Sequence, residues 1–524
     1  MANVNLFSNH DRKTGRTDTH NQAGGRAYSM SDKHALAQYA ATGMFGDTFY
    51  ADGKAQLDKV LELANVVDTE FLAKVAIYSR KFGYLKDMPA LLIAVLASRD
   101  LELCKKVFGD VIDNGRMLRN FVQIMRSGVT GRKSLGSGPK KMVQRWLRNA
   151  TDDQIFRASV GNKPSLADVI KMVRPSPETK SRDALYAYVI DRKYDKRSLP
   201  KLVKEYETFK KGTRGNRELP KVPFQLLDSG NLTNEEWVRI AQDAKWQATR
   251  MNLNTYARHG VFDHPGMTNR ISKRLADPVN VEKAMAFPYQ LLQAWRNVDG
   301  TVPARVKASL EDAMELAVSN VPMFEGKIYV GVDFSASMAQ GVNTGGDWQS
   351  AAVMSCNDVA SLFASCIIRQ NPDTDVYRFD TRAYKLNLNA RDSIMTNAQK
   401  IGRRGGGTDC SCVLRELNRQ NAKGDAVIIL SDMESWADNG YGYRRDTGMQ
   451  VEWNKFSRRN PNAKLICIDL AANSTTQAKE TMKGKILNVG GFSDAVFKVT
   501  TAFIAGEGSP DYWTNLIETG ITID

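Results

Sequence analysis

Disulfide frameworks, long apolar runs and signal-peptide features are all missing from this 524-residue sequence. The six cysteines are scattered, without a C-x-x-C pair or a regular spacing, so we expect reduced thiols. The longest apolar run, at residues 89–97, is less than half of the roughly 20 residues that a membrane-spanning helix needs. The first twenty residues are polar and do not resemble a signal peptide. These absences predict a cytoplasmic protein that does not bind membranes.

Length and charge divide the chain into two parts. At 524 residues it exceeds what one hydrophobic core usually organises, so two or more domains are expected. Residues 321–524 contain 22 Lys or Arg and 23 Asp or Glu, whereas residues 1–320 contain 51 and 35. The excess of basic over acidic residues that gives the net charge of +15 therefore lies entirely in residues 1–320. In a cytosolic protein such an asymmetry usually serves a polyanionic partner, most often nucleic acid, and a basic surface kept for solubility is the alternative.

The secondary-structure pattern also changes near residue 322. Upstream, segment after segment has apolar residues at helical spacing, as in residues 57–64, 71–78 and 91–96, with Gly- or Pro-containing breaks between them. A long series of short helices predicts stacked helical hairpins, a solenoid of the HEAT kind whose curvature would make an arc or a ring.

Downstream, apolar strands alternate with helical stretches. Strands are predicted at residues 327–332, 375–379, 426–430 and 464–470, with helices such as residues 350–369 between them. This alternation is typical of a doubly wound α/β domain with a mostly parallel sheet. Ligands of such sheets bind at the carboxyl ends of the strands.

Oxygen-bearing side chains gather at three predicted strand ends. "DFSAS" carries Asp333, Ser335 and Ser337, the Gly-rich "GRRGGGTDCS" carries Thr408, and "LSDMES" places Asp432 directly after a strand. Two carboxylates and three hydroxyls, some acting through water, suit a hard divalent cation, magnesium first and manganese second. They leave a coordination position open for an outside ligand. The alternative is that these polar residues only cap helices and tie down loops.

The basic excess is concentrated in one segment. Residues 116–148 contain nine Lys or Arg and no Asp or Glu, and a second cluster flanks the loop "RPSPETKSR". Cationic segments of this kind contact the phosphates of RNA. Phe121 and Trp146 have apolar neighbours at helical spacing, so we expect them in the core rather than as stacking platforms. The predicted RNA-binding residues are Arg116, Arg119, Arg126, Arg132, Lys133, Lys140, Lys141, Arg145, Arg148, Lys171, Arg174, Lys180 and Arg182.

Several segments resemble one family in order and spacing. Residues 20–54, 248–263 and 286–298 resemble the opening, late and closing segments of the TROVE module of the Ro autoantigen family. "DFSASM", "GGTDCS" and "VGGFSDAVF" resemble the von Willebrand factor A domain that follows in the same proteins, and the five oxygen ligands resemble its metal-ion-dependent adhesion site. Over nearly its full length, the chain thus resembles a bacterial-type Ro protein.

The resemblance implies a fold and a set of partners. It implies a TROVE module at residues 1–322, a ring of HEAT-like helical repeats, closed by a doubly wound α/β von Willebrand factor A domain at residues 323–524. Family members bind single-stranded 3′ ends of misfolded noncoding RNA in the hole of the ring, and duplex RNA and Y RNA on the basic outer surface. Bacterial relatives deliver structured RNA to a ring-shaped exoribonuclease. We expect these partners here, no DNA, and a monomer apart from the RNA–protein complex.

One departure from the family concerns the basic segments. The family's hole-lining basic segment aligns with residues 131–148 and 167–180. Many relatives carry a histidine in an "HPKP"-like stretch, where this chain has Arg174 in "VRPSPE". The substitution keeps the positive charge and removes any role for a neutral imidazole.

Three classes of function follow. The first is a noncatalytic RNA-binding protein that acts in RNA quality control or degradation. The second is a metal-dependent adaptor whose open coordination position recruits a protein, such as an exoribonuclease. The third, a metal-dependent nuclease or phosphatase, is disfavoured because only five histidines are present, H-E-x-x-H is absent and the hydroxyl-rich site has no evident general base. We therefore do not expect an enzyme.

Overall fold

The computed structural model describes residues 16–523 except 44, 46, 214–216, 228, 285–286, 319–322, 343–353, 403–404, 439–444, 480–483 and 510. Its internal contacts divide the chain into two compact units. We call Met1–Val67, Phe287–Gln293 and Ala317–Ile521 the α/β unit, and Asp68–Ala286, Ala294–Leu316 and Thr522–Asp524 the helical unit. Among the described residues, no helix combines the length and the apolar character that a membrane crossing would need.

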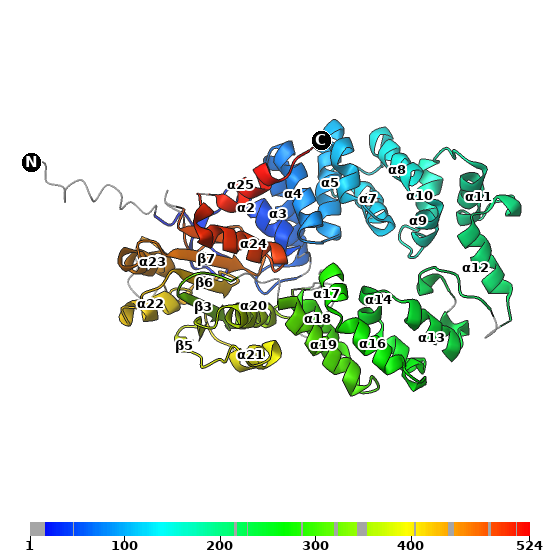
Figure 1. Cartoon of the computed structure of the whole chain (residues 1–524). Coiled ribbons are helices and arrows are strands. Elements are labelled where there is room, and N and C mark those ends of the chain that lie inside the picture. Colours follow the sequence, from blue (N-terminus) through cyan, green and yellow to red (C-terminus); the bar gives the residue numbers. More distant parts are fainter. Residues whose placement is uncertain are drawn as a thin grey trace, which may run out of the picture. The chain divides into compact units, whose positions relative to one another are not determined.

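Short helices follow one another from α4 to α19, drawn from blue to green in Figure 1. Several begin at a capping side chain, as at Asp68, Asp100 and Asn114, whose oxygens accept backbone N–H bonds. The helices are α4 (Thr69–Lys81), α5 (Asp87–Arg99), α6 (Leu101–Val111), α7 (Gly115–Ser127), α8 (Ser137–Asn149), α9 (Asp152–Arg157), α10 (Leu166–Val173), α11 (Lys180–Val189), α12 (Lys201–Lys211), α13 (Asn234–Asp243), α14 (Trp246–Met251), α15 (Leu253–Arg258), α16 (Met267–Leu275), α17 (Pro278–Ala284), α18 (Pro288–Asn297) and α19 (Ala304–Ala317), with 3-10 turns η2 (Lys196–Ser198), η3 (Phe224–Leu226), η4 (Ser229–Asn231) and η5 (Val261–Asp263).

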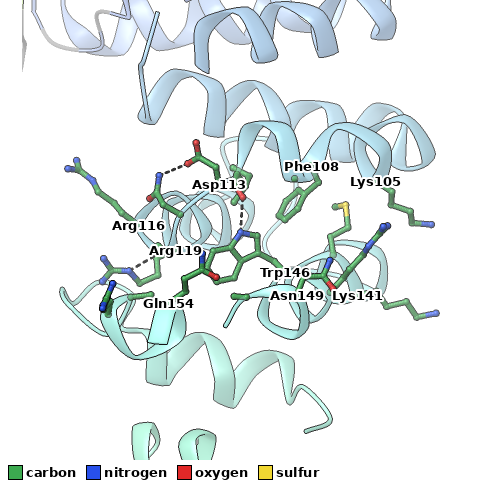
Figure 2. Close-up of a pocket in the computed structure, with 18 of the residues that line it drawn as sticks. Lys105, Phe108, Asp113, Arg116, Arg119, Lys141, Trp146, Asn149 and Gln154 are labelled. Atoms are coloured by element: carbon green, nitrogen blue, oxygen red, sulfur yellow. Dashed lines mark hydrogen bonds between the residues drawn. The ribbon is translucent and has the colours of Figure 1, made fainter. Parts of the chain in front are cut away.

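Each helix of the helical unit packs mainly on those near it in sequence. α4 packs on α5 and α6, α5 on α6 and α7, α6 on α8, and α10 on both α7 and α8. Such nearest-neighbour packing is what makes a solenoid. The predicted helical-repeat region is therefore confirmed. Residues of α6, α7, α8 and α9 line a cavity of about 890 Å³ (Figure 2).

The α/β unit is built on a six-stranded sheet of order β5-β4-β3-β6-β7-β9. Only the edge strand β5 is antiparallel to its neighbour. Four strands lie within one residue of the predicted ends, and β5 and β9 were not predicted. Their bounds are β3 (Ile328–Asp333), β4 (Asp375–Phe379), β5 (Ala383–Lys385), β6 (Ala426–Ser431), β7 (Lys464–Asp469) and β9 (Ile486–Gly490).

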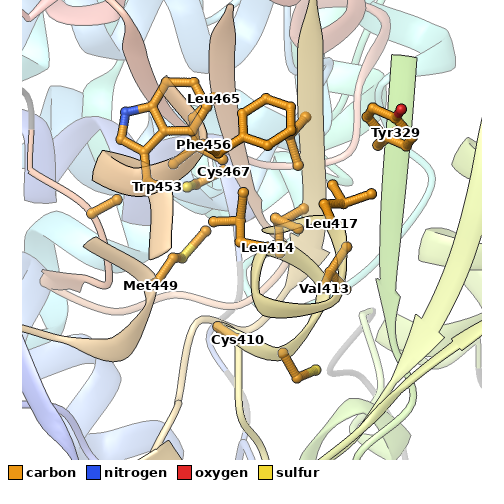
Figure 3. Packing of buried hydrophobic residues seen from close by; sticks show 14 of the residues in the cluster. Tyr329, Cys410, Val413, Leu414, Leu417, Met449, Trp453, Phe456, Leu465 and Cys467 are labelled. Atoms are coloured by element: carbon orange, nitrogen blue, oxygen red, sulfur yellow. The ribbon is translucent and has the colours of Figure 1, made fainter. Parts of the chain in front are cut away.

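Helices cover both faces of this sheet, which makes the unit a three-layer, doubly wound α/β domain as predicted. On one face, α22 and α23 pack Leu414, Trp453 and Phe456 against the strands, as Figure 3 shows. α20 packs against β3, β4 and β6, whose alternate residues, such as Ile428, are also buried. The helical elements are η7 (Ala336–Ala339), α20 (Cys356–Gln370), α21 (Ile394–Ile401), α22 (Cys412–Arg419), α23 (Gly448–Arg459), α24 (Asp494–Ala502), the π-helical η9 (Phe503–Glu507) and α25 (Tyr512–Gly520).

The first part of the chain also contributes to the α/β unit. β1 (Thr19–His20) pairs with β2 (Arg26–Ser29), which pairs in turn with β8 (Thr475–Thr476). α2 (Asp32–Thr42) packs on β9 and α25, and α3 (Gly53–Val66) packs on α2. The compact units therefore do not follow the predicted boundary between residues 322 and 323, because these elements bury their apolar side chains in the α/β unit. Residue 322 itself lies outside the described residues.

Candidate functional site

The predicted metal ligands meet where the sheet reverses its winding direction. From β3 the chain passes to β4 on one side and later to β6 on the other, so the carboxyl ends of β3 and β6 flank a topological switch point. Asp333 is the last residue of β3, and Asp432 directly follows β6. Both side chains are fully buried.

Hydrogen bonds hold the first loop against the neighbouring strand. The backbone N–H of Ser335 donates to Asp333 Oδ1 over 2.8 Å, and the Ser431 hydroxyl donates to Asp333 Oδ2 over 2.6 Å. The hydroxyls of Ser335 and Ser337 lie 3.2 Å apart. A hydrogen bond from Ser337 favours the charged form of Asp432. The structure therefore brings Asp333, Ser335, Ser337 and Asp432 together.

Thr408 approaches the same edge from the Gly-rich loop. Ala336 N–H donates to the Gly406 carbonyl over 3.2 Å, which ties the first loop to the second. The Thr408 carbonyl accepts from Trp436 N–H over 3.1 Å, which ties the second loop to the segment that follows Asp432. Thr408 is buried, like the other four predicted ligands.

Burial sets the electrostatics of these carboxyl groups. Loss of hydration raises the pKa of Asp333, and the charge of Asp432 raises it further. Burial also raises the pKa of Asp432, and burial together with Asp432 raises that of Glu434 to about 8. Two carboxylates held this close without a counter-charge are costly, and a bound cation would remove that cost.

The donor set fits a hard divalent cation. Asp432 Oδ2 is buried and has no hydrogen-bond partner among the described residues, so it is available as a ligand. In the described part of the chain, no group of three or more His, Cys, Asp or Glu side chains could hold a metal, so a site here depends on the hydroxyls of Ser335, Ser337 and Thr408. Magnesium accepts such oxygen ligands and keeps part of its water.

Three further residues of this site escaped the sequence analysis. Ser431 stands next to Asp432 in "LSDMES" and could have been noticed there. The Asn357 side chain donates to the Asp333 carbonyl over 3.0 Å. Tyr50 forms a hydrogen bond with Ser337 and is half-buried beside the two aspartates. Nothing in the sequence relates Tyr50 to Asp333, the end of a strand 283 residues further along the chain.

The predicted RNA-binding residues lie on α7, α8, α10, α11 and the loops that join them. All thirteen belong to the helical unit. Arg119, Arg132, Lys140 and Arg182 are half-buried, and the side chains of the other nine are exposed. Two of the exposed side chains form long ion pairs: Arg116 lies 3.8 Å from Asp87, and Arg148 lies 3.7 Å from Glu178.

Arg182 differs from the rest because its guanidinium is already occupied. It forms an ion pair with Asp152 over 2.6 Å and donates to the carbonyls of Leu147 and Ala150 over 2.6 and 2.7 Å. These bonds fasten α11 to the ends of α8 and α9. Arg182 therefore serves the packing of the repeats, and we place no RNA contact on it.

The two aromatic residues that we expected in the core differ in their burial. Phe121 is fully buried, as predicted. Trp146 is only half-buried and lines the cavity between α6 and α9, so its core assignment was wrong. Helical spacing alone gave that assignment, and it cannot tell a packed helix face from a cavity wall.

Comparisons with known proteins agree on one family. Residues 327–504 match the family model described as the Ro60 vWA domain. The chain is 25% identical to the RNA-binding protein RO60 of Deinococcus radiodurans over 93% of this chain and 95% of that protein. It is 23% identical to the RNA-binding protein RO60 of Caenorhabditis elegans over 49% of this chain and 39% of the relative.

The fold agrees as well. The crystal structure of the Deinococcus radiodurans RO (RSR) protein superposes with a TM-score of 0.64, at 21% identity, over 91% of this chain and 100% of that chain. The match extends over both the helical repeats and the α/β domain. The chain thus shares its fold with the Deinococcus radiodurans RO protein, is similar in sequence to a protein named RO60 over most of its length, and matches the Ro60 vWA domain at residues 327–504.

Proposed function

We propose that this chain is a noncatalytic RNA-binding protein. The observation that carries the proposal is the cluster of exposed cations on α7, α8 and their connecting loop, over a stretch without a single acidic residue. Phosphate contacts from such side chains supply most of the affinity for RNA and fix its position. The two curated relatives are named RNA-binding proteins, which supports the same function here.

The finer role follows the family. We propose that the RNA is misfolded or structured noncoding RNA, with the single-stranded 3′ end in the hole of the ring that the resemblance implies, and duplex RNA and Y RNA on the basic outer surface. The protein would act in RNA quality control or degradation in the cytoplasm. A ring-shaped exoribonuclease is the proposed protein partner. The exposed basic side chains support RNA rather than a neutral or cationic partner.

Charge reversal of two free cations tests RNA binding. Lys133 and Lys140 have no ion-pair partner among the described residues, and neither lines the cavity. In Lys133→Glu/Lys140→Glu, we expect the affinity for a structured RNA to fall about tenfold or more at 0.1 M salt, because phosphate contacts are lost. The slope of log K against log salt should become shallower by about two. Fluorescence anisotropy over a range of salt concentrations measures both.

A second double variant separates phosphate contacts from net charge. Lys423 and Arg458 are exposed on the α/β unit, and Lys423→Glu/Arg458→Glu changes the net charge by the same amount. We expect this control to retain nearly all of its affinity. Equal losses in the two double variants would mean that net charge, and no particular surface, attracts RNA. Failure of the unaltered protein to bind structured RNA in dilute buffer would overturn the proposal.

We also propose that Asp333, Ser335, Ser337, Thr408 and Asp432 hold a divalent cation, most simply magnesium, with manganese possible. The unpartnered Asp432 Oδ2 and the two uncompensated carboxyl groups support it. When bound, the cation would supply a Lewis-acidic position that accepts an outside oxygen ligand.

This gives a second candidate function, a metal-dependent adaptor that captures a carboxylate of a protein partner. A partner lost on adding chelator, with RNA binding intact, would favour the adaptor function.

A further inference from the structure

The cavity between α6, α7, α8 and α9 combines an aromatic side chain with several unpaired cations. Resting on the proposed RNA binding, we propose that this cavity binds a single unpaired nucleotide of the RNA. Its base would stack on the indole of Trp146, and its phosphates would meet Arg119 and Arg145. The proposal adds a specific site for one nucleotide to a surface that otherwise recognises the sugar-phosphate backbone.

The indole of Trp146 is half-buried, lines the cavity and is held in place by a hydrogen bond. Its Nε1 donates to the Ile112 carbonyl over 2.7 Å, so the polar edge of the ring is satisfied by the protein. Figure 2 shows the ring in the middle of the cavity, between Phe108 and Gln154. Phe108 is itself fixed edge-to-face against Phe121, with ring centroids 5.0 Å apart. A fixed, half-buried aromatic ring is what an unstacked base requires as a platform.

The charges around the cavity favour phosphate. Seven Lys or Arg residues line it against one acid, Asp113. Asp113 is already bound by Arg80, whose Nη2 lies 2.7 Å from its carboxylate. Among the described residues, no acidic side chain forms an ion pair with Lys106, Arg119, Lys141 or Arg145, so these cations are not neutralised within the protein.

Of the cations that line the cavity, Arg119 has the side chain whose position is best fixed by its neighbours. Its Nε donates to the Gly115 carbonyl over 3.4 Å, one turn earlier in α7. Its guanidinium also lies directly over Gly161, where a side-chain Cβ would sit only 2.6 Å from Nη1. Burial and the neighbouring Arg116 lower the pKa of Arg119, which shows a cation held without a counter-charge. A phosphate at this position would supply that counter-charge.

The size of the cavity limits the ligand. A volume of about 890 Å³ lies at the upper end of the range for small-molecule pockets and accommodates a nucleotide, whereas a base-paired helix is far too wide. The amide of Asn149 is exposed at the lining and can meet the polar edge of a base, as can Nε2 of Gln154, whose Oε1 already accepts the Thr151 N–H over 2.8 Å. Stacking together with phosphate binding favours RNA over an acidic peptide, which would use the cations and leave the ring face without a partner.

Two short hairpin RNAs that differ by one unpaired nucleotide test the proposal. One hairpin is fully paired, and the other carries a single bulged adenosine in the same stem. We expect the full-length protein to bind the bulged hairpin about 5- to 100-fold more tightly, which is the contribution of one base stacked on an aromatic ring. Adenosine monophosphate should compete with the bulge at millimolar concentration, and free adenosine should compete less well because it lacks the phosphate.

Variants identify the cavity as the source of the difference. Trp146→Ala should remove the preference for the bulge and leave binding of the paired hairpin unchanged, and Arg119→Gln should reduce the preference. Trp146→Phe keeps an aromatic ring and should keep most of the preference, so it decides the question if Trp146→Ala fails to fold. The matched control is Trp295→Ala, because Trp295 is also half-buried in the helical unit and lies outside the cavity, against Lys307.

Three results would overturn the proposal: equal binding of the two hairpins by the unaltered protein, a preference that survives in both Trp146→Ala and Arg119→Gln, or an acidic peptide that displaces the bulged hairpin better than adenosine monophosphate does. If neither hairpin binds at all, RNA binding itself fails, which is a different outcome.

Discussion

At the scale of the residue, the clearest functional signal is the presence of positively charged side chains in the first turns of two helices, where negative charge is preferred. Cations in the first turn of a helix are unfavourable, by about 0.3–1 kcal/mol each at exposed positions, because the N-terminus is already positive. α7 nevertheless has Arg116 in its first turn, α8 has Lys140, and neither helix has an acid there. Stability does not explain this arrangement. A polyanionic ligand does, since its phosphates would reverse the sign of the interaction.

The five predicted oxygen ligands are another residue-scale pattern, and one substitution tests them. Asp333→Asn keeps the shape of a protonated carboxyl group and removes the negative charge, so we expect the variant to fold and to lose divalent-cation binding. Calorimetric titration with magnesium or manganese should give heat with the unaltered protein and none with the variant. Asp469→Asn, at the end of β7 opposite Ser431 in the sheet register, is the matched control and should titrate normally. Identical heats for all three proteins would exclude the site.

At the scale of the element, periodicity predicted most of the architecture. β3, β6 and β7 are largely apolar runs, and their ends, like those of β4, fall within a residue of the prediction. β9 escaped because its sequence, "ILNVG", includes a polar residue and a glycine. Trp146 was misplaced for a related reason: an apolar position at helical spacing can face a neighbouring helix or a cavity, and only the packing of α6 to α9 decides between them.

The packing of α2 predicts a loss of stability in acid. His34 on α2 is buried edge-to-face against Trp513, with ring centroids 5.5 Å apart, and its Nε2 has no hydrogen-bond partner among the described residues. Burial lowers the pKa of His34 to about 4, although Asp511 and a backbone contact at Asn488 act in the opposite direction. In the unfolded chain the imidazole takes up a proton near pH 6.5. The contribution of the neutral, buried His34 to the free energy of unfolding is therefore fully present above pH 6.5 and is lost as the pH falls toward 4.

His34→Gln measures this contribution. Between pH 7.5 and pH 4.5 the free energy of unfolding should fall in both proteins. Because the neutral amide of the variant does not titrate, its fall should be smaller than that of the unaltered protein by roughly 2–3 kcal/mol. Urea unfolding followed by circular dichroism at the two pH values gives the difference. Gln38→Ala, which changes a buried side chain of α2 that does not titrate, should leave the pH dependence as it was. The same acid sensitivity in both variants would exclude His34 as its source.

At the scale of the whole molecule, the α/β unit is assembled from distant parts of the chain. Besides residues 317–521, it contains residues 1–67 and 287–293. Within it, Ala27, Tyr28, Leu36 and Ala37 are almost completely buried. Gly25 lies so close to the Ser435 carbonyl that a Cβ atom there would be 1.8 Å from the oxygen. The described part of the N-terminal segment is therefore part of the hydrophobic core and not an appendage to it.

Truncation at the predicted boundary tests this assembly. Residues 323–524 expressed alone would leave the faces of β9 and α25 that α2 covers in contact with water. We expect this fragment to bind a hydrophobic dye and to melt at a lower temperature than the full-length protein. Coexpression with residues 1–67 should restore part of the melting temperature, and coexpression with the same segment carrying Gly25→Leu should restore less. A fragment 323–524 as stable as the full-length protein would show that the segment adds nothing.

The sequence by itself determined the patterns that are local along the chain: the helical repeats, the parallel strands, the charge of the first part, and the oxygen-rich strand ends of the α/β domain. Hydrophobic period, capping residues and charge counts need no knowledge of distant contacts. Only the tertiary structure decided which cations are free and which, like Arg182, are consumed in packing. It alone placed Tyr50 beside the predicted metal ligands, opened the cavity at Trp146 and added the described residues before Asp68 to the α/β unit. These features depend on which distant segments bury surface against one another, and no local pattern encodes that choice.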